Sequence, residues 1–407
     1  MTSVLEDYLN GIADMLYISF EKYGKIVKLA INQEISMDIQ LIDDGEEILC
    51  NQFYNRIYKR NRTIDQWRWE FAQNNYKSSP IPYARVMDES QVVGTQAFIP
   101  IRMIDIDGVF WTAKSEETLV DPDYRGRQLF EKMYNFLFDY ARTNQFACIW
   151  GFTPAIKAFK RLDFSFPGKV DQIFIPFQNK SISLLLKKED RSENVNFKNK
   201  LKRAVFLIAG LVAQGISMVR LNLNKNSPLT GLAIKRWDKP DEQCGELCKQ
   251  FIQQWGGTTI YRDAEYMQWR FFDNPYVKCI VKGVYDQDRL LGWVAYNIGD
   301  DGMGYLIDLI LIRADYTVAP KEIIKQLLIE AAIGCRNMGA SGIRGWHANN
   351  HPFDKLICEA ARDVGYYHIR KGHETVIYFC ETGKVRNGYT NFDNWFVTRI
   401  NTEGVHG

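Results

Sequence analysis

The stretch TLVDPDYRGRQLF, residues 118–130, decides how this 407-residue chain is interpreted. An apolar strand ends in an Asp-Pro pair, a turn follows with Arg125 and Gly126, and a helix is predicted for 127–144, where apolar residues recur at helical spacing. Unpaired N–H groups at the start of a helix, together with the helix dipole, favour an anion such as a diphosphate. The pattern is equally consistent with an ordinary strand–turn–helix that carries a basic surface turn.

The same order of elements occurs twice in the chain. QWRW at 66–69 and QWRF at 268–271 lie 202 residues apart, and Gly94 and Gly292, each in a predicted hairpin, lie 198 residues apart. A strand, a helix, a strand and a helix follow each hairpin, predicted at 110–120, 127–144, 146–152 and 155–162, and again at 304–312, 320–338, 342–347 and 352–364. An amphipathic helix precedes each QWR motif, predicted at 46–59 and 241–255. The sequence therefore predicts an α+β (α/β) fold of two tandem modules, each a mixed, largely antiparallel sheet flanked by helices.

The repeat divides the chain into four segments. We predict an N-terminal helical extension at 1–35, a first module at 36–175, a helical connector at 176–224 and a second module at 225–400. The connector holds the longest apolar run, which is shorter than the roughly 18–20 residues that a membrane-spanning helix needs. We therefore expect a buried helix, with membrane-surface association as the alternative because a basic stretch precedes the run.

Composition excludes several classes of protein. The 46% hydrophobic and 25% charged residues are typical of a globular chain, and a net charge of +2 does not indicate nucleic-acid binding. The first residues lack the pattern of a signal peptide, and eight scattered cysteines indicate a reduced, cytoplasmic protein. Cys244 and Cys248 lie one helical turn apart without a second ligand pair nearby, so we interpret them as packing residues and predict no metal.

At residues 118–130 the chain resembles the GNAT superfamily of acyl-CoA-dependent N-acyltransferases. The signature of that family is a strand followed by V-x-P-x-Y-R-G-x-G-x-G, and the residues that match in order are Val120, Pro122, Tyr124, Arg125 and Gly126. Gln128 and Phe130 stand where the family has its two later glycines. GFTPAIKAFKRLDF, at 151–164, resembles the closing segment of the family, with Asp163 in place of a glycine. Phe159 stands where many members carry a tyrosine that protonates the leaving thiolate.

The resemblance implies that module 1 binds acyl-CoA as a co-substrate through the amides of this loop. The residues it assigns to CoA are Leu119, Val120, Arg125, Gly126, Arg127, Gln128, Leu129 and Phe130. In module 2 the corresponding stretch, 312–324, has no Arg-Gly pair. We therefore expect that module 2 no longer holds CoA and serves the acceptor, the interface between the modules, or both.

N-acylation needs a neutral amine, so a base must accept its proton. Family members often use a carboxylate on the strand before the CoA loop, and Glu116 and Glu117 are the nearest candidates here, with a solvated strand end as the alternative. Asp308 is the one charged residue in an apolar strand of module 2, and we assign it to the substrate, although a structural hydrogen-bond acceptor would fit equally. Arg270, in the second QWR motif, is assigned to the substrate as well.

The remaining candidates follow a predicted strand of module 2, in the sequence GWHANNHPF. We assign His347 and His351 to catalysis, and Asn349 and Asn350 to the substrate, because polar residues at a strand end suit ligand contact. The alternative is capping of the helix that Pro352 opens.

The resemblance is to two-module members such as the bacterial nucleotide-sugar N-acyltransferases. It implies transfer of an acyl group from acyl-CoA to a primary amine, most specifically the amino group of a nucleotide-linked sugar, by direct attack on the thioester. We expect a small-molecule acceptor, no nucleic acid and no stable membrane insertion, and the sequence leaves a homo-oligomer open. Two alternatives stay open: an aminoacyl-tRNA-dependent peptidoglycan transferase, for which a more basic surface is expected, and a non-catalytic protein with two such modules.

Overall fold

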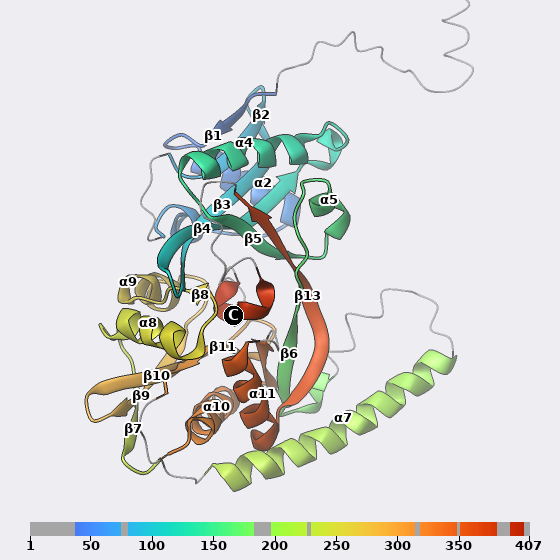
Figure 1. Ribbon diagram of the computed structural model, residues 1–407. Coiled ribbons are helices and arrows are strands. Elements are labelled where there is room, and N and C mark those ends of the chain that lie inside the picture. Colours follow the sequence, from blue (N-terminus) through green and yellow to red (C-terminus); the bar gives the residue numbers. More distant parts are fainter. Residues whose placement is uncertain are drawn as a thin grey trace, which may run out of the picture.

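The structure is a computed structural model that describes residues 37–74, 80–182, 197–225, 229–313, 318–347, 351–380 and 391–402 (Figure 1). The predicted N-terminal extension lies outside these residues, as do Asn349 and Asn350. The α+β fold class predicted from the sequence, a mixed sheet flanked by helices, is confirmed, but the strands of the two modules join into one sheet instead of forming two.

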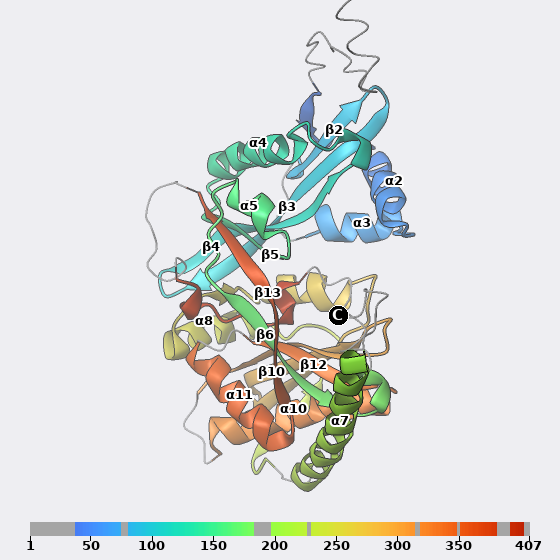
Figure 2. The ribbon, with the colours of Figure 1, turned by 90° about the vertical axis from the view of Figure 1, so that its right-hand side faces the viewer.

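Module 1 begins with a short edge strand and two helices that pack on one face of its strands. Its elements are β1 (Ile39–Leu41), α2 (Glu47–Tyr58), α3 (Ile64–Phe71), β2 (Tyr83–Asp88), β3 (Gln91–Asp105), β4 (Gly108–Val120), η1 (Pro122–Tyr124), α4 (Leu129–Thr143), β5 (Cys148–Thr153), α5 (Ile156–Lys160) and β6 (Lys169–Pro176). Helix α4 covers the opposite face of the sheet from α2 and α3 (Figure 2). A capping box between Thr63 and Gln66 fixes the start of α3.

Module 2 repeats this order after the long helix α7 (Phe197–Asn224). Its elements are β7 (Leu232–Arg236), α8 (Cys244–Trp255), β8 (Thr259–Ile260), α9 (Ala264–Met267), the π-helix η2 (Gln268–Phe272), β9 (Ile280–Asp286), β10 (Arg289–Ile298), β11 (Gly304–Leu311), α10 (Pro320–Asn337), β12 (Gly342–His347), α11 (Pro352–Val364) and β13 (Tyr367–Phe379). Two short turns, η3 (Phe392–Asn394) and η4 (Arg399–Asn401), end the described chain. Prolines at the first turns of α10 and α11 set where these helices begin.

The last strands of the two modules are exchanged. Strand β6 of module 1 pairs antiparallel with β12 of module 2, and β13 of module 2 pairs antiparallel with β5 of module 1. The two exchanged strands also pair with each other. All strands consequently form one continuous sheet, in the order β1-β2-β3-β4-β5-β13-β6-β12-β11-β10-β9-β7, with β8 joined to β3. The modules cannot separate without breaking strand pairs in both halves.

A reciprocal tryptophan pair joins the modules near the centre of the molecule. Trp69 Nε1 donates to the carbonyl of Trp269 at 2.9 Å, and Trp269 Nε1 donates to the carbonyl of Trp69 at 2.8 Å. The two rings stack with centroids 5.1 Å apart. The two paired tryptophans lie 200 residues apart in the sequence, whereas the QWR motifs lie 202 residues apart. The residues that are equivalent in the structure are therefore shifted by two positions from those that the motifs align.

We predict that Trp69→Phe destabilises the protein by about 1–3 kcal/mol more than Trp67→Phe, as measured by urea denaturation. Both tryptophans are buried in α3 and lose the same ring volume on substitution. Only Trp69→Phe leaves a carbonyl of the other module without its donor, because Trp67 Nε1 has no acceptor among the described residues. Equal losses in the two variants would contradict a contribution from the reciprocal hydrogen bonds.

Candidate active site

The parallel strands β4 and β5 separate at the centre of module 1. They pair only at Ala113 with Ile149 and at Lys114 with Trp150, although both strands continue further. Beyond these pairs the space between them belongs to a cavity of about 640 Å³. Its lining residues are Ile57, Tyr58, Ser115, Glu116, Glu117, Thr118, Leu119, Val120, Arg125, Phe130, Gly151, Phe152, Thr153, Ala155, Ala158, Phe159 and Val376.

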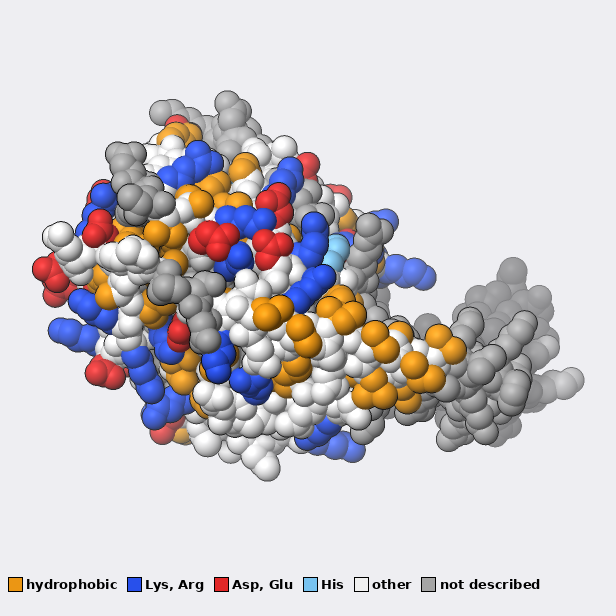
Figure 3. Space-filling view, turned by 90° about the horizontal axis from the view of Figure 1, so that it is seen from below, with side chains coloured by type: hydrophobic (Ala, Val, Ile, Leu, Met, Phe, Trp, Pro, Cys, Tyr) orange, Lys and Arg blue, Asp and Glu red, His pale blue; other side chains and the backbone are white. Residues whose placement is uncertain are grey.

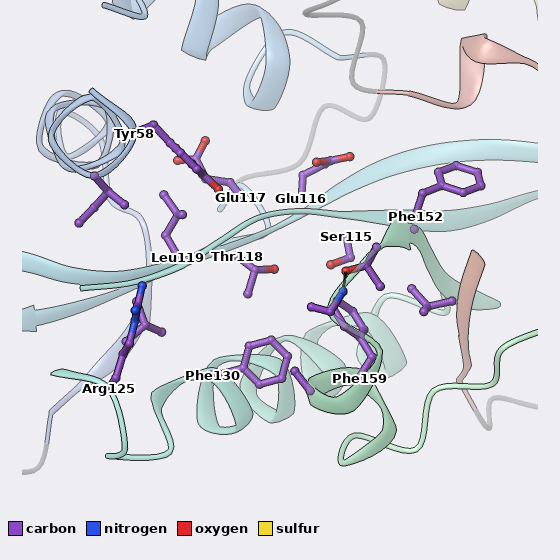
Figure 4. A pocket seen from close by; sticks show the side chains of 17 residues that line it. Tyr58, Ser115, Glu116, Glu117, Thr118, Leu119, Arg125, Phe130, Phe152 and Phe159 are labelled. Atoms are coloured by element: carbon purple, nitrogen blue, oxygen red, sulfur yellow. Dashed lines mark hydrogen bonds between the residues drawn. The ribbon is translucent and has the colours of Figure 1, made fainter. Parts of the chain in front are cut away.

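The cavity is lined from both faces of β4. Glu116 and Glu117 point toward the α2 side of the strand, whereas Phe130 and Phe159 lie on the opposite side (Figure 4). Two ligands could therefore approach the gap between the strands from opposite sides and meet at β4.

A second cavity, of about 270 Å³, lies at the start of α4 and shares Val120, Arg125 and Phe130 with the first. Its other lining residues are Tyr124, Gly126, Gln128, Leu129, Glu131 and Arg161. No side chain caps α4 at Gln128, so the N–H groups of the first helical turn face this space. Six of the eight residues that the sequence assigned to CoA line this cavity, Leu119 lines the larger one, and Arg127 lies over the ring of Tyr124.

The backbone of the loop explains both the glycine that is kept and one that is replaced. Gly126 has a φ of +83°, and an added Cβ would meet nothing within 4 Å, so the backbone faces open space. Gln128 has a φ of +60°, in the left-handed region that costs a side chain about 1–2 kcal/mol. The family glycine at this position therefore has a conformational reason, and Gln128 keeps the same conformation at a cost.

Glu117 is held in a buried network. Arg62 donates to both of its carboxylate oxygens, and the hydroxyl of Tyr83 donates to it as well. The carboxylate side chain is 3% exposed and sits at a β-bulge where the φ of Glu117 is +48°. Because the guanidinium and the phenol already occupy its oxygens, this carboxylate has little room for a hydrogen bond from a substrate amine.

Glu116 is the more accessible of the two carboxylates. Its side chain is 14% exposed. It forms an ion pair with the buried Lys114, which precedes it by two residues on β4. Because Glu116 lines the cavity without a second cationic partner among the described residues, it can still accept a hydrogen bond from a ligand.

A hydroxyl cluster on the other side of β4 was not predicted from the sequence. The hydroxyl of Tyr134 lies 2.6 Å from Ser115 Oγ and 3.0 Å from Thr118 Oγ1, and burial raises the pKa of Tyr134 to about 12. The ring of Tyr134 packs against Phe159, which has no hydroxyl. Ser115 and Thr118 are thus the hydroxyl groups that face the cavity where the family places a tyrosine.

The corresponding gap in module 2 is filled. Strands β11 and β12 pair at three positions, and the C-terminal segment then crosses both strands: Arg399 lies 4.3 Å from the ring of Tyr305 and 5.3 Å from that of Trp346. The preceding Phe396 exchanges backbone and side-chain hydrogen bonds with β8 and its neighbours. Module 2 therefore offers no open equivalent of the module 1 cavity among the described residues.

Asp308 is held in a buried network of module 2. It is fully buried, receives a bidentate ion pair from Arg262, and accepts hydrogen bonds from Trp293 and Thr398. Contact with a substrate would require this ion pair to break. The assignment of Asp308 to the substrate stays a prediction. Arg262 lies 200 residues after Arg62, and Asp308 is the module 2 counterpart of the Glu117 region.

Both ring nitrogens of His351 contact the protein itself, and its assignment to catalysis stays a prediction. Its Nδ1 accepts from the N–H of Phe353 and so caps α11, and its Nε2 lies 3.0 Å from the carbonyl of Gly256. Both ring nitrogens are therefore used by a neutral imidazole. Burial lowers the pKa of His351.

His347 lies at the end of β12, away from the module 1 cavity. Its Nδ1 is 3.3 Å from Cys358 Sγ and 3.7 Å from Asp354 Oδ2, and the three donor atoms lie within 4.8 Å of one another. Such a set could hold a cation such as zinc, so the prediction that the protein uses no metal is best tested here. Its catalytic role stays a prediction.

Arg270 is buried in η2, and its Nε and Nη2 have no acceptor among the described residues. A buried cation without a carboxylate partner is costly. Its assignment to the substrate stays a prediction.

Comparison with known proteins gives similarity of fold alone. No family model matches the chain, and no curated protein matches it in sequence. Three solved structures match 84% of the chain, a span that includes both modules: a GCN5-related N-acetyltransferase from Anabaena variabilis (TM-score 0.54, 10% identity, 73% of that chain), a probable N-acyltransferase from Enterococcus faecalis (0.53, 9%, 72%), and Saccharomyces cerevisiae N-myristoyltransferase with bound myristoyl-CoA (0.53, 13%, 82%).

The fold is similar to that of a GCN5-related N-acetyltransferase and of an N-myristoyltransferase, which agrees with the resemblance drawn from the sequence. Within that fold, this chain has the form in which two modules lie in tandem and share one sheet.

We predict that Gln128→Gly and Gln145→Gly raise the stability by a similar amount, up to about 1 kcal/mol in urea denaturation. Both glutamines are exposed at ends of α4 with φ near +60°, so each substitution relieves the same left-handed strain. Only Gln128→Gly should also change affinity for CoA, because Gln128 lines the cavity at the helix start. An equal change in CoA affinity for both variants would contradict this location of the site.

We predict that His351 makes the protein less stable as the pH falls below about 6.5. The folded state holds the imidazole neutral, so the unfolded state binds more protons below its own pKa of about 6.5, and stability rises with pH through this range. His351→Asn keeps a capping side chain and should flatten the pH dependence of Tm between pH 5 and 7, whereas His351→Ala should lower Tm at every pH. Identical pH profiles for the wild type and His351→Asn would rule the mechanism out.

Proposed function

We propose that the protein is an N-acyltransferase that moves an acyl group from acyl-CoA to a primary amine at the gap between β4 and β5. The observation that carries this proposal is a continuous site in which an uncapped helix start adjoins a cavity between two diverging strands. The fold of the GNAT superfamily, in which N-myristoyltransferase was solved with myristoyl-CoA, supports it.

The residues at the start of α4 fit the diphosphate of CoA. The free N–H groups of the first turn and the helix dipole favour an anion there, and Arg125 lines both cavities. Gly126 lets the backbone approach the phosphates, because no side chain occupies the space in front of it. The larger cavity is within the usual size of small-ligand sites and leads from this point toward Ser115.

The chemistry follows from the two faces of β4. The acceptor amine approaches from the Glu116 side and attacks the thioester carbonyl carbon, forming the C–N bond; the C–S bond then breaks and CoA leaves as a thiolate. Glu116, directly or through water, takes the proton that the amine loses. Ser115, linked to Tyr134, is the hydroxyl available to hydrogen-bond the departing sulfur in place of the tyrosine that Phe159 replaces.

The acceptor is proposed here only as a primary amine on a small molecule. A nucleotide-linked amino sugar, implied by the sequence resemblance, stays the first candidate to test. The retained helix start and cavity favour catalysis over a purely structural role, because a decayed site would have no need to keep Gly126 and the open gap. The near-neutral net charge disfavours a tRNA substrate.

We predict that Gly126→Asp lowers affinity for CoA at least tenfold, measured by isothermal titration calorimetry with full-length protein. An Asp side chain fits at this position, because an added Cβ meets nothing within 4 Å, and its carboxylate would face the diphosphate. Gly108→Asp is the matched control, because Gly108 also has a positive φ and open space, but lies in the β3–β4 turn. Gly108→Asp should bind CoA like the wild type.

Failure of the wild type to bind any CoA or acyl-CoA at millimolar concentration would overturn the proposal. Binding is then followed by a turnover assay that detects free thiol, with acetyl-CoA and a set of amines that includes nucleotide-linked amino sugars. Thiol release that depends on the amine and is lost in Gly126→Asp is the expected result.

A further inference from the structure

Helix α7 presents an apolar stripe to solvent. Seven large apolar side chains on it are 43–76% exposed: Val205, Ile208, Leu211, Val212, Ile216, Val219 and Leu223. Most of them recur at intervals of three or four residues, which places them on one side of a helix. Seen from below, the stripe runs along the helix beyond the body of the protein (Figure 3).

The opposite side of α7 already has its partners. Leu221 is buried, Ser217 Oγ donates to the carbonyl of Gly365, and Gln214 Nε2 donates to the carbonyl of Phe177. These positions differ from the exposed ones by about half a helical turn. The helix is therefore fixed to module 2 by one side, and the exposed stripe is a second apolar side that this fold does not use. The expectation of a buried helix in this connector is thus wrong for one side of α7.

All charged residues of α7 are basic. Its sequence contains no Asp or Glu between 197 and 224. It contains five basic residues, four of which lie in its first two turns: Lys198, Lys200, Lys202, Arg203 and Arg220. Within the described ranges, no helix combines the length and the apolarity that crossing a bilayer requires. A helix that has an exposed apolar stripe, several basic residues and no acidic ones is typical of helices that lie in the plane of an anionic membrane surface.

We propose that α7 docks the protein on an anionic lipid bilayer, with its apolar stripe in the membrane interface. The stripe from Val205 to Leu223 is about 27 Å long and straight, as a planar surface requires. A second copy of α7 offers no acidic residue to pair with these lysines, so charge complementarity favours the lipid. The proposal does not depend on acyl transfer, because α7 lines neither cavity of module 1.

The test is co-sedimentation of full-length protein with vesicles of phosphatidylcholine that contain or lack 30% phosphatidylglycerol. The wild type should bind the anionic vesicles, and binding should weaken in high salt. The triple variant Val205→Gln, Val212→Gln and Val219→Gln should bind at least tenfold more weakly. The matched control is Ile48→Gln, Ile106→Gln and Met338→Gln, which removes apolar side chains of similar exposure from other elements. It should bind like the wild type.

Equal Tm values for both triple variants establish that folding is retained, since all six positions are exposed. Replacement of the four basic residues of the first turns with Gln should remove the preference for anionic vesicles. The proposal is overturned if the wild type binds no vesicles, or if the α7 triple variant binds like the control. It is also overturned if light scattering shows a dimer that the α7 triple variant dissociates while vesicle binding is absent, because the stripe then pairs with a second copy.

Discussion

The exchange of β6 and β13 is the constraint on which the rest of the structure depends. Each strand closes the sheet of the module to which it does not belong in sequence, and the two pair with each other at the centre. Buried backbone groups must be paired, so neither module has a complete sheet alone. The reciprocal hydrogen bonds of Trp69 and Trp269 cross the same boundary, so each module donates one hydrogen bond to the other there. The site of module 1 is thus built on a sheet whose closing strand is supplied by module 2.

A buried arginine–carboxylate pair lies at equivalent positions in the two modules, but its surroundings differ. Arg62 with Glu117 lies beside an open cavity, and Arg262 with Asp308 lies beneath the C-terminal segment. A buried ion pair is costly to form and strongly destabilising to break, so both pairs are fixed parts of the fold. The difference in ligand access between the modules therefore arises from what covers the pair. In module 2, Thr398 and its neighbours cover the pair, whereas in module 1 a cavity adjoins it.

Helices and strands that depend on a local sequence pattern were predicted well. Strand pairs and side-chain contacts between residues distant in sequence were not predicted. Periodicity and prolines placed β12 and α11 at their observed bounds, and α4 and β4 within two residues. The strands β6 and β13 were missed, and nothing local indicates that a strand closes the sheet of another module. The loop before α4 could be singled out from the sequence because its residues are contiguous. The partners of Asp308 and His351, which are Arg262 and Gly256, were not predicted because they are distant in sequence. Ser115 and Tyr134 were missed for the same reason.

The departures of the loop from the family pattern are less severe in three dimensions than in sequence. An anion at a helix start contacts backbone N–H groups, so the side chain matters only where it changes φ or occupies the space of the ligand. Gln128 adopts the left-handed conformation that the family glycine provides, and the ring of Phe130 packs on Phe159 at the cavity wall. Gly126, where a side chain would enter the open space directly, is the position that is retained. In module 2 the Arg-Gly pair is absent and the C-terminal segment covers the gap, so the loss of the loop and the closing of the cavity occur together.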